Sequence, residues 1–94
     1  MRTATHKAQF DAWRKKRGIK VRHSLQAVLP SGTDLRTGDT VAYTNPNGVT
    51  WSPLKVLGFE PEPDNGRCVY LDWECYWFPV QPSRCRVIRK AKKA

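Results

Sequence analysis

Turn-forming residues divide the chain from Leu35 onward into short segments, and this spacing constrains the fold more than any other feature. Gly38-Asp39, Asn45–Gly48 and Asn65-Gly66 each place glycine beside Asp or Asn, the combination that tight turns favour. Between the turns the chain is rich in β-branched and aromatic residues, and 40–43 alternates in the period of a strand. Four to five short strands joined by turns predict a mainly β fold, a small barrel or sandwich rather than a parallel sheet.

Proline and acidic residues refine the expected strand boundaries. Pro53 has no amide hydrogen to donate to a sheet, so it indicates an edge or a bulge at the start of the second strand. The stretch "EPEPDNG", Glu60–Gly66, predicts an acidic loop, and "QPSRC" predicts a compact turn before the last strand. We expect strands at 40–43, around 55–59, at 67–72, at 75–80 and at 86–88.

The N-terminal segment "THKAQFDAWRKKRG" predicts a short helix. Thr5 is its expected N-cap and Gly18 its expected C-terminal glycine, directly after a basic last turn. Phe10 and Trp13 lie three residues apart and would share the face that docks on the rest of the protein. The expected organisation is a basic helix with an extended lead-in at 1–34, a barrel at 35–89 and a basic tail at 90–94.

Positive charge is concentrated at the two ends of the 94-residue chain, whose formal net charge is +9. Residues 1–36 carry nine Lys or Arg against two acids, and residues 84–94 carry six and no acid. Residues 37–83 carry two Lys or Arg against six acids, so the middle is acidic. A surface shaped by solubility alone would mix the signs, so the segregation favours a polyanionic partner.

The stretch "GRCVYLDWECYWFPV", residues 66–80, holds five aromatic side chains, and both faces of its expected strands are apolar. The rings either fill the core and lie under the N-terminal helix, stack on nucleic-acid bases, or form a protein-binding patch. We expect the first of these for Tyr70, Phe59, Phe78 and Trp13. We expect Trp51, Trp73 and Trp77 to be exposed.

The residue types that carry catalysis or hold metals do not form a recognisable pattern. The cysteines, Cys68, Cys75 and Cys85, are odd in number and lack the paired short spacing of zinc modules. No carboxylate pair, catalytic triad or phosphate-binding glycine loop stands out, so we expect neither an enzyme nor a cofactor. An apolar run of about 20 residues and a secretory signal are both missing from the sequence, and cytoplasmic residence is expected.

The order of turns and strands over about 35–89 resembles SH3-like barrels such as the KOW and Tudor domains. Within that class, Gly38–Val41, Val56–Gly58 after Trp51, and Phe78–Val80 resemble plasmid-borne type II dihydrofolate reductases. That family builds its pore from a Val-Gln-Ile-Tyr run, where this chain reads Cys75–Phe78, so the resemblance implies no reductase activity. The pattern "GDTVxYTN…GRCVYLD…YWFPV" is similar to short proteins of plasmids and other mobile elements, a family without an established activity.

The sequence therefore predicts a non-enzymatic, cytoplasmic nucleic-acid-binding protein of a bacterial mobile element. Its basic ends, including the 84–93 tail, would contact phosphates, and exposed tryptophans would stack bases. The competing prediction is a protein-interaction module, either a homodimer or an adaptor for an acidic protein, that uses the aromatic hairpin. The expected nucleic-acid-binding residues are Arg14, Lys15, Lys16, Arg17, Lys20, Arg22, Arg84, Arg86, Arg89, Lys90, Trp51, Trp73 and Trp77.

Overall fold

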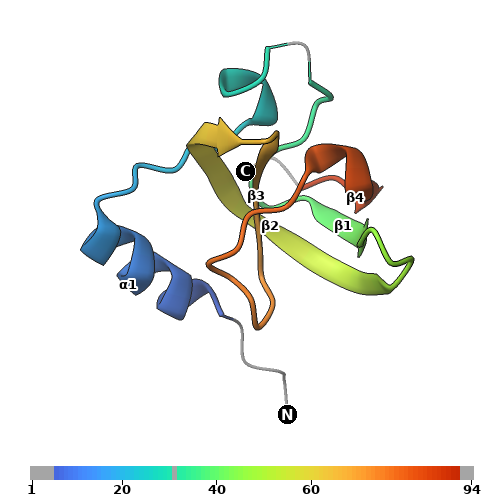
Figure 1. Ribbon diagram of the computed structural model, residues 1–94, viewed down its shortest axis with the longest axis horizontal. Coiled ribbons are helices and arrows are strands. Elements are labelled where there is room, and N and C mark those ends of the chain that lie inside the picture. The colour runs from blue at the N-terminus through green and yellow to red at the C-terminus, as the bar shows by residue number, and fades with distance from the viewer. Residues whose placement is uncertain (1–5, 31, 92–94) are drawn as a thin grey trace.

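A computed structural model describes residues 6–30 and 32–91, and in it the protein is mainly β with one N-terminal helix (Figure 1). The strands are β1 (Thr40–Thr44), β2 (Thr50–Asp64), β3 (Arg67–Leu71) and β4 (Cys85–Arg89). They form one antiparallel four-stranded sheet in the order β3-β2-β1-β4. The mainly β prediction is confirmed in this coarser form, with four strands where four to five were expected.

The long strand β2 connects the two halves of the sheet. Its first part pairs with β1, as in Thr40 opposite Lys55, and its second part pairs with β3, as in Phe59 opposite Val69. The β1–β2 ladder shifts register opposite Ser52 and Pro53, which confirms the bulge predicted at this proline. Strand β2 therefore changes partner along its length, and this brings β1 and β3 around one core.

That core consists mainly of aliphatic side chains from β1, β2, β3 and the segments before β1 and after β3, and from β4 only the partly buried Cys85 packs against it. Leu25 in a 3₁₀ turn (Leu25–Ala27) and Leu35 belong to it, and Phe59 is fully buried within it. Burial at these positions supplies most of the driving force for folding in so small a domain. The full set of buried residues in this cluster is Leu25, Leu35, Val41, Tyr43, Val56, Phe59, Cys68, Val69, Leu71 and Val80.

Helix α1 (Lys7–Arg17) packs on the opposite face of β2 and β3, away from β1 and β4 (Figure 1). Phe10 is buried against Leu57 and Tyr70, and the Phe10 and Tyr70 ring centroids lie 5.0 Å apart. Trp13 packs beside them, partly buried. The two-residue docking stripe predicted from the sequence is confirmed, and it explains why β3 is apolar on both faces.

The predicted ends of the helix are confirmed only on one side. Gly18 ends it in the left-handed conformation at φ 71°, where its own N–H and that of Ile19 reach the carbonyls of Lys15 and Arg14. The predicted N-cap, Thr5, lies outside the described residues. At this end the backbone N–H of His6 donates to the carboxylate of Asp72 at 2.6 Å, so the loop after β3 holds the start of the helix.

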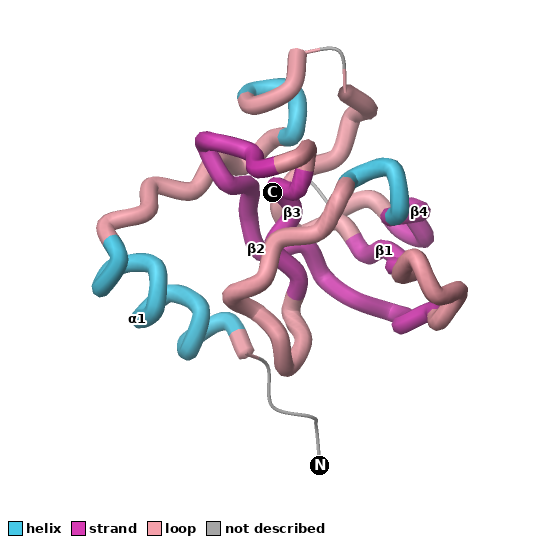
Figure 2. The backbone as a smooth tube through the Cα atoms, viewed as in Figure 1, coloured by secondary structure: helices cyan, strands magenta, loops and turns pink. Residues whose placement is uncertain are grey.

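Two predictions about the sheet were wrong. Residues 60–64 continue β2 instead of forming a loop, and the turn is confined to Asn65-Gly66. Residues 75–80 are not a strand: a turn with Phe78 N–H donating to the Cys75 carbonyl replaces it, and only Val80 pairs with β3, opposite Val69. Figure 2 shows this stretch as a long loop between β3 and the 3₁₀ turn at Pro82–Arg84.

Over the described ranges, 6–30 and 32–91, no helix is long and apolar enough to cross a membrane.

Candidate nucleic-acid interface

The cations of the helix do not all remain free in the structure. Arg14 pairs with Asp11, with 3.2 Å between its Nε and the carboxylate, and the Arg17 guanidinium lies 5.7 Å from the centroid of the Trp13 ring. Lys15 and Lys16 are exposed. The basic last turn therefore offers a cationic surface that is only partly committed to contacts within the protein.

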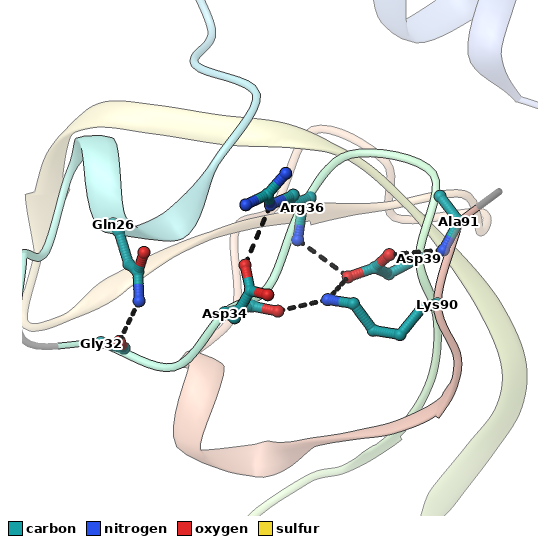
Figure 3. A network of polar contacts seen from close by, with 7 residues as sticks. All are labelled: Gln26, Gly32, Asp34, Arg36, Asp39, Lys90 and Ala91. Atoms are coloured by element: carbon teal, nitrogen blue, oxygen red, sulfur yellow. Dashed lines mark hydrogen bonds and ion pairs between the residues drawn. The ribbon is translucent and has the colours of Figure 1, made fainter. Parts of the chain in front are cut away.

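Lys90, a predicted phosphate contact, is part of an internal network around Asp39 (Figure 3). The Asp39 side chain is only 1% exposed, and its Oδ2 lies 2.6 Å from the Lys90 ammonium. Its two oxygens also accept hydrogen bonds from the backbone N–H groups of Arg36 and Ala91. Lys90 additionally donates to the carbonyl of Asp34. The start of the tail is thus fastened to the Gly-Asp turn.

The pKa of Asp39 reflects this network. Burial by itself raises the pKa of this carboxyl, but the hydrogen bonds from Lys90, Ala91 and Arg36 outweigh burial, so the pKa is lowered. Asp39 therefore carries a negative charge at neutral pH, which makes the Lys90 ammonium a structural counterion.

The outer sheet face, defined here by Thr40, Ala42, Lys55, Arg86 and Arg89, carries cations from two distant parts of the sequence. Thr40 lies opposite both Lys55 on β2 and Arg89 on β4, and Ala42 lies opposite Arg86. Residues opposite one another in a sheet project from the same face, and Thr40 and the buried Ala42 alternate with the core residues Val41 and Tyr43. A register shift between Thr40 and Val41 in the β1–β4 ladder lets Arg86 and Arg89, three residues apart, lie on that same face. The sheet thus aligns three cations away from the core.

A depression of about 400 Å³ lies at one end of this face. Lys55, Thr40 and Arg89 line it, together with Gly38 and the first residues of the tail, and no acidic residue among those that the structure describes lines it. Over the part of the chain that the structure describes, Lys55, Arg86 and Arg89 form no ion pair. Their charges are therefore available to an anion.

Sequence reasoning found Arg86 and Arg89 but missed Lys55. Lys55 lies in the acidic middle of the chain, where a count by segment hides it. The strand period is the signal that could have found it, because residues two apart on a strand share a face. Leu57, two residues after Lys55 on β2, faces away from the main core and packs under the helix, so Lys55 lies on the outer face as well.

The predicted aromatic residues fall into two groups. Trp51 stacks on Tyr43 at 5.8 Å between ring centroids, and the edge of Trp73 meets both rings at 5.4 and 5.3 Å. Trp77 lies elsewhere and meets only Tyr76, edge to face, among the described rings. The structure therefore does not bring the three tryptophans together as one stacking platform.

The exposure of these rings differs from the prediction at two positions. Trp51 and Trp77 are exposed as predicted, at 37% and 48%. Trp73 is instead half-buried against the core, and its indole Nε1 is buried without a hydrogen-bond partner among the described residues. Phe78, predicted to be in the core, is 45% exposed, because the segment around it is a loop and its ring lies beside the Arg67 guanidinium.

The remaining predicted cations lie apart from these clusters. Lys20 and Arg22 are exposed in the lead-in, where the backbone of Arg22 pairs with Phe59. Arg84 is exposed at the end of the 3₁₀ turn and lines a second, aromatic depression. The end of the tail, 92–94, lies outside the described residues.

The thiols offer no obvious reactive centre. Burial raises the pKa of Cys85 to about 12 and that of Cys68 to about 11, so both remain protonated at neutral pH. Cys75 is exposed. Within 6–30 and 32–91, no group of three or more His, Cys, Asp or Glu side chains is placed to hold a metal ion.

Comparison of the chain with protein-family models, with curated proteins and with solved structures finds no match. The resemblances to SH3-like barrels, to reductases and to proteins of mobile elements therefore stay predictions from the sequence, as does residence in the cytoplasm.

Proposed function

We propose that this protein is a non-enzymatic nucleic-acid-binding protein that holds phosphates on its outer sheet face. The observation that carries the proposal is the row of Lys55, Thr40 and Arg89 across three strands, which lines a depression free of acids. Two cations flank a hydroxyl there, a combination that suits a phosphate oxygen. Arg86 extends the row along β4 toward its first residue.

The helix would supply a second contact surface. Lys15 and Lys16 are exposed on its last turn, and Lys20 follows in the lead-in. Cations at several separate places suit an extended polyanion better than a small anion, since each phosphate neutralised releases a condensed counterion. Contacts of this kind give affinity with little sequence preference.

We also propose that the sheet belongs to a small barrel of the SH3-like type. Strand β2 pairs with β1 in one half and with β3 in the other. After β3, the bridge between Val69 and Val80 returns the chain to the free edge of β3 just before it enters β4 beside β1. This route supports the barrel arrangement that the order of turns predicts.

The test is fluorescence anisotropy with labelled single-stranded DNA, duplex DNA and RNA, each titrated at two salt concentrations. We expect submicromolar binding near 100 mM salt and a steep loss of affinity as salt rises. The Lys55→Ala variant should bind every probe more weakly and should reduce the slope of log K against log salt by about 1.

The matched control is Arg36→Ala, which removes one positive charge at a residue that pairs with Asp34 at 2.9 Å and lies outside the depression. It should leave the salt slope unchanged. Failure of the protein to bind any of the three probes near 100 mM salt would overturn the proposal. Equal effects of the two variants would place the phosphate contacts elsewhere.

The competing function, a protein-interaction module, is favoured by a different observation. Val87 and Ile88 are 39% and 48% exposed on β4, an edge strand whose second side has no pairing partner in the sheet. Exposed apolar side chains on an open edge suit pairing with another strand, although Arg86 and Arg89 would repel a second copy. Sedimentation at rising protein concentration tests the homodimer form of this module, because a homodimer gains mass and a monomeric nucleic-acid binder does not.

A further inference from the structure

A second depression, of about 170 Å³, lies between the end of β1 and the loop that precedes β4. Its walls combine the rings of Tyr43 and Phe78 with two guanidinium groups, those of Arg67 and Arg84. The guanidinium carbon of Arg67 lies 5.7 Å from the centroid of the Phe78 ring. Pro46 and Gln81 also line the depression.

Lys55 and Arg67 are the two cations of residues 37–83, and each lines a depression together with a cation of residues 84–94. Lys55 is joined by Arg89, and Arg67 is joined by Arg84. The aromatic depression differs from the other in having rings, one of them the exposed Phe78. Its chemistry therefore suits a flat ring that carries a negative charge close by.

Size narrows the choice of ligand. Pockets for drug-sized molecules measure about 300–1,000 Å³, so a depression of about 170 Å³ accommodates a single ring system rather than a larger molecule. A nucleobase with its adjoining phosphate meets both requirements. A base inside a duplex is stacked on both sides and cannot enter, so the base must be unpaired.

The aromatic depression and the phosphate row lie at opposite ends of β4. Arg84 precedes the first residue of β4, Cys85, and Arg89 is the last residue of the strand. The two ends of a five-residue strand are about 13 Å apart. Arg86 lies between them on the outer sheet face. Tyr43, which lines the aromatic depression, projects toward the core side of β1, whereas Thr40 lies on the outer face. One extended strand of nucleic acid would therefore meet both depressions by passing around β4, the edge strand.

We propose that the aromatic depression is a subsite for one unpaired nucleobase and its phosphate, so that the protein prefers single-stranded to duplex nucleic acid. Phe78 stacks on the base, Arg84 contacts the phosphate, and Arg67 contributes charge beside the ring. This inference rests on the proposed nucleic-acid binding and adds the class of nucleic acid to it.

The experiment compares a labelled single strand of about 10 nucleotides with a duplex of the same sequence, by anisotropy at one salt concentration. Phe78→Ala should weaken single-strand binding by between about 5-fold and 150-fold, the range expected for one stacked base, and should leave duplex binding unchanged. Phe78→Tyr, which keeps an aromatic face, should retain most of the affinity. Arg84→Ala should weaken single-strand binding more than duplex binding.

The control is Val49→Ala, which removes an exposed apolar side chain, 49% exposed, that does not line the depression. It should leave the preference for single strands intact. Binding of both nucleic acids with equal affinity, or a preference unaffected by Phe78→Ala, would overturn the subsite and leave the phosphate proposal standing. Absence of binding to either probe would overturn both, and circular dichroism of each variant checks that it is folded.

Discussion

Asp39 shows at the scale of one residue how the sequence connects a turn to the end of the chain. Its buried carboxylate accepts hydrogen bonds from the N–H groups of Arg36 and Ala91 and from the Lys90 ammonium. Asp39→Ala leaves these donors without their acceptor, and we expect it to lower the free energy of unfolding by about 2–4 kcal/mol. Urea denaturation measures this loss. The control is Asp34→Ala, which removes an exposed carboxylate paired with Arg36. It should lower the free energy of unfolding by less than about 1 kcal/mol, because exposed ion pairs contribute little to stability.

The same residue makes stability depend on pH. Because the folded-state pKa of Asp39 lies below the ordinary value of 3.8, its contribution is fully present above that value and is lost as pH falls through the folded pKa. The pKa of Asp11 is lowered too, first by its hydrogen bond with Lys7. We therefore expect acid to destabilise the wild type more than Asp39→Asn, and the difference between the two unfolding curves isolates Asp39. Parallel curves for the two proteins would contradict this role.

The cysteines differ in reactivity according to their surroundings. Burial raises the pKa of both Cys68 and Cys85, whereas Cys75 is exposed in the loop after β3. At pH 8 we expect a thiol reagent to label one cysteine per folded chain rapidly and all three in denaturant. Cys75→Ser should remove the rapid phase. Rapid labelling of two thiols would show that β3 or β4 opens readily.

At the scale of elements, helix α1 depends on the sheet for its stability. Eleven residues are too few for a stable isolated helix in water, so the buried Phe10 ring supplies the necessary tertiary contact. We expect Phe10→Ala to lower the free energy of unfolding by about 3–5 kcal/mol and Phe10→Leu by about 1 kcal/mol. Lys16→Ala, on the exposed side, should change it by less than about 0.5 kcal/mol. Denaturation followed by circular dichroism makes the comparison, and a small loss for both Phe10 variants would show that the helix does not contribute to cooperative folding.

The sequence predicted correctly those helix and strand boundaries that single glycine or proline residues determine. Gly18 ends the helix, the Gly38-Asp39 turn precedes β1, and Pro53 marks the bulge, each through backbone conformation or a missing amide hydrogen. The extension of β2 was missed because Pro61 and Pro63 suggest a loop. Both prolines lie where β2 pairs with β3, in the stretch between Phe59 and Asp64 where the register of that ladder shifts, so the strand continues through an irregularity there.

The aromatic segment and the cationic face could not be predicted because tertiary contacts decide both. Residues 75–80 have the composition of a strand, yet Asp72 and Tyr76 contact the start of the helix and the segment forms a loop instead. Pairing across β2, β1 and β4 places Lys55 and Arg89, 34 positions apart in the chain, on either side of Thr40. No local sequence pattern predicts a pairing over that separation. The hydrogen bond between Lys90 and Asp39 likewise joins residues that are far apart in the sequence.

At the scale of the whole molecule, the net charge of +9 is large for the size of the protein. The radius of gyration is 12.5 Å, whereas the Debye length is about 30 Å at 0.01 M salt and about 8 Å at 0.15 M. In dilute salt every cation therefore feels the others across the folded protein, and at physiological salt only near neighbours interact. The compact state concentrates this repulsion, which a bound polyanion, such as the nucleic acid proposed above, would neutralise.

It follows that simple salt should stabilise the protein in the absence of a partner. We expect the free energy of unfolding to rise by on the order of 1 kcal/mol between 0.01 M and 0.15 M sodium chloride, as repulsion is screened. Replacing Lys15 and Lys16 by serine lowers the net charge to +7 and should reduce this gain, whereas Glu74→Gln raises it to +10 and should enlarge it. Urea denaturation at the two salt concentrations measures all three proteins. A loss of stability with salt would mean that ion pairs such as that of Asp39 with Lys90 outweigh the repulsion, because screening weakens attraction and repulsion alike.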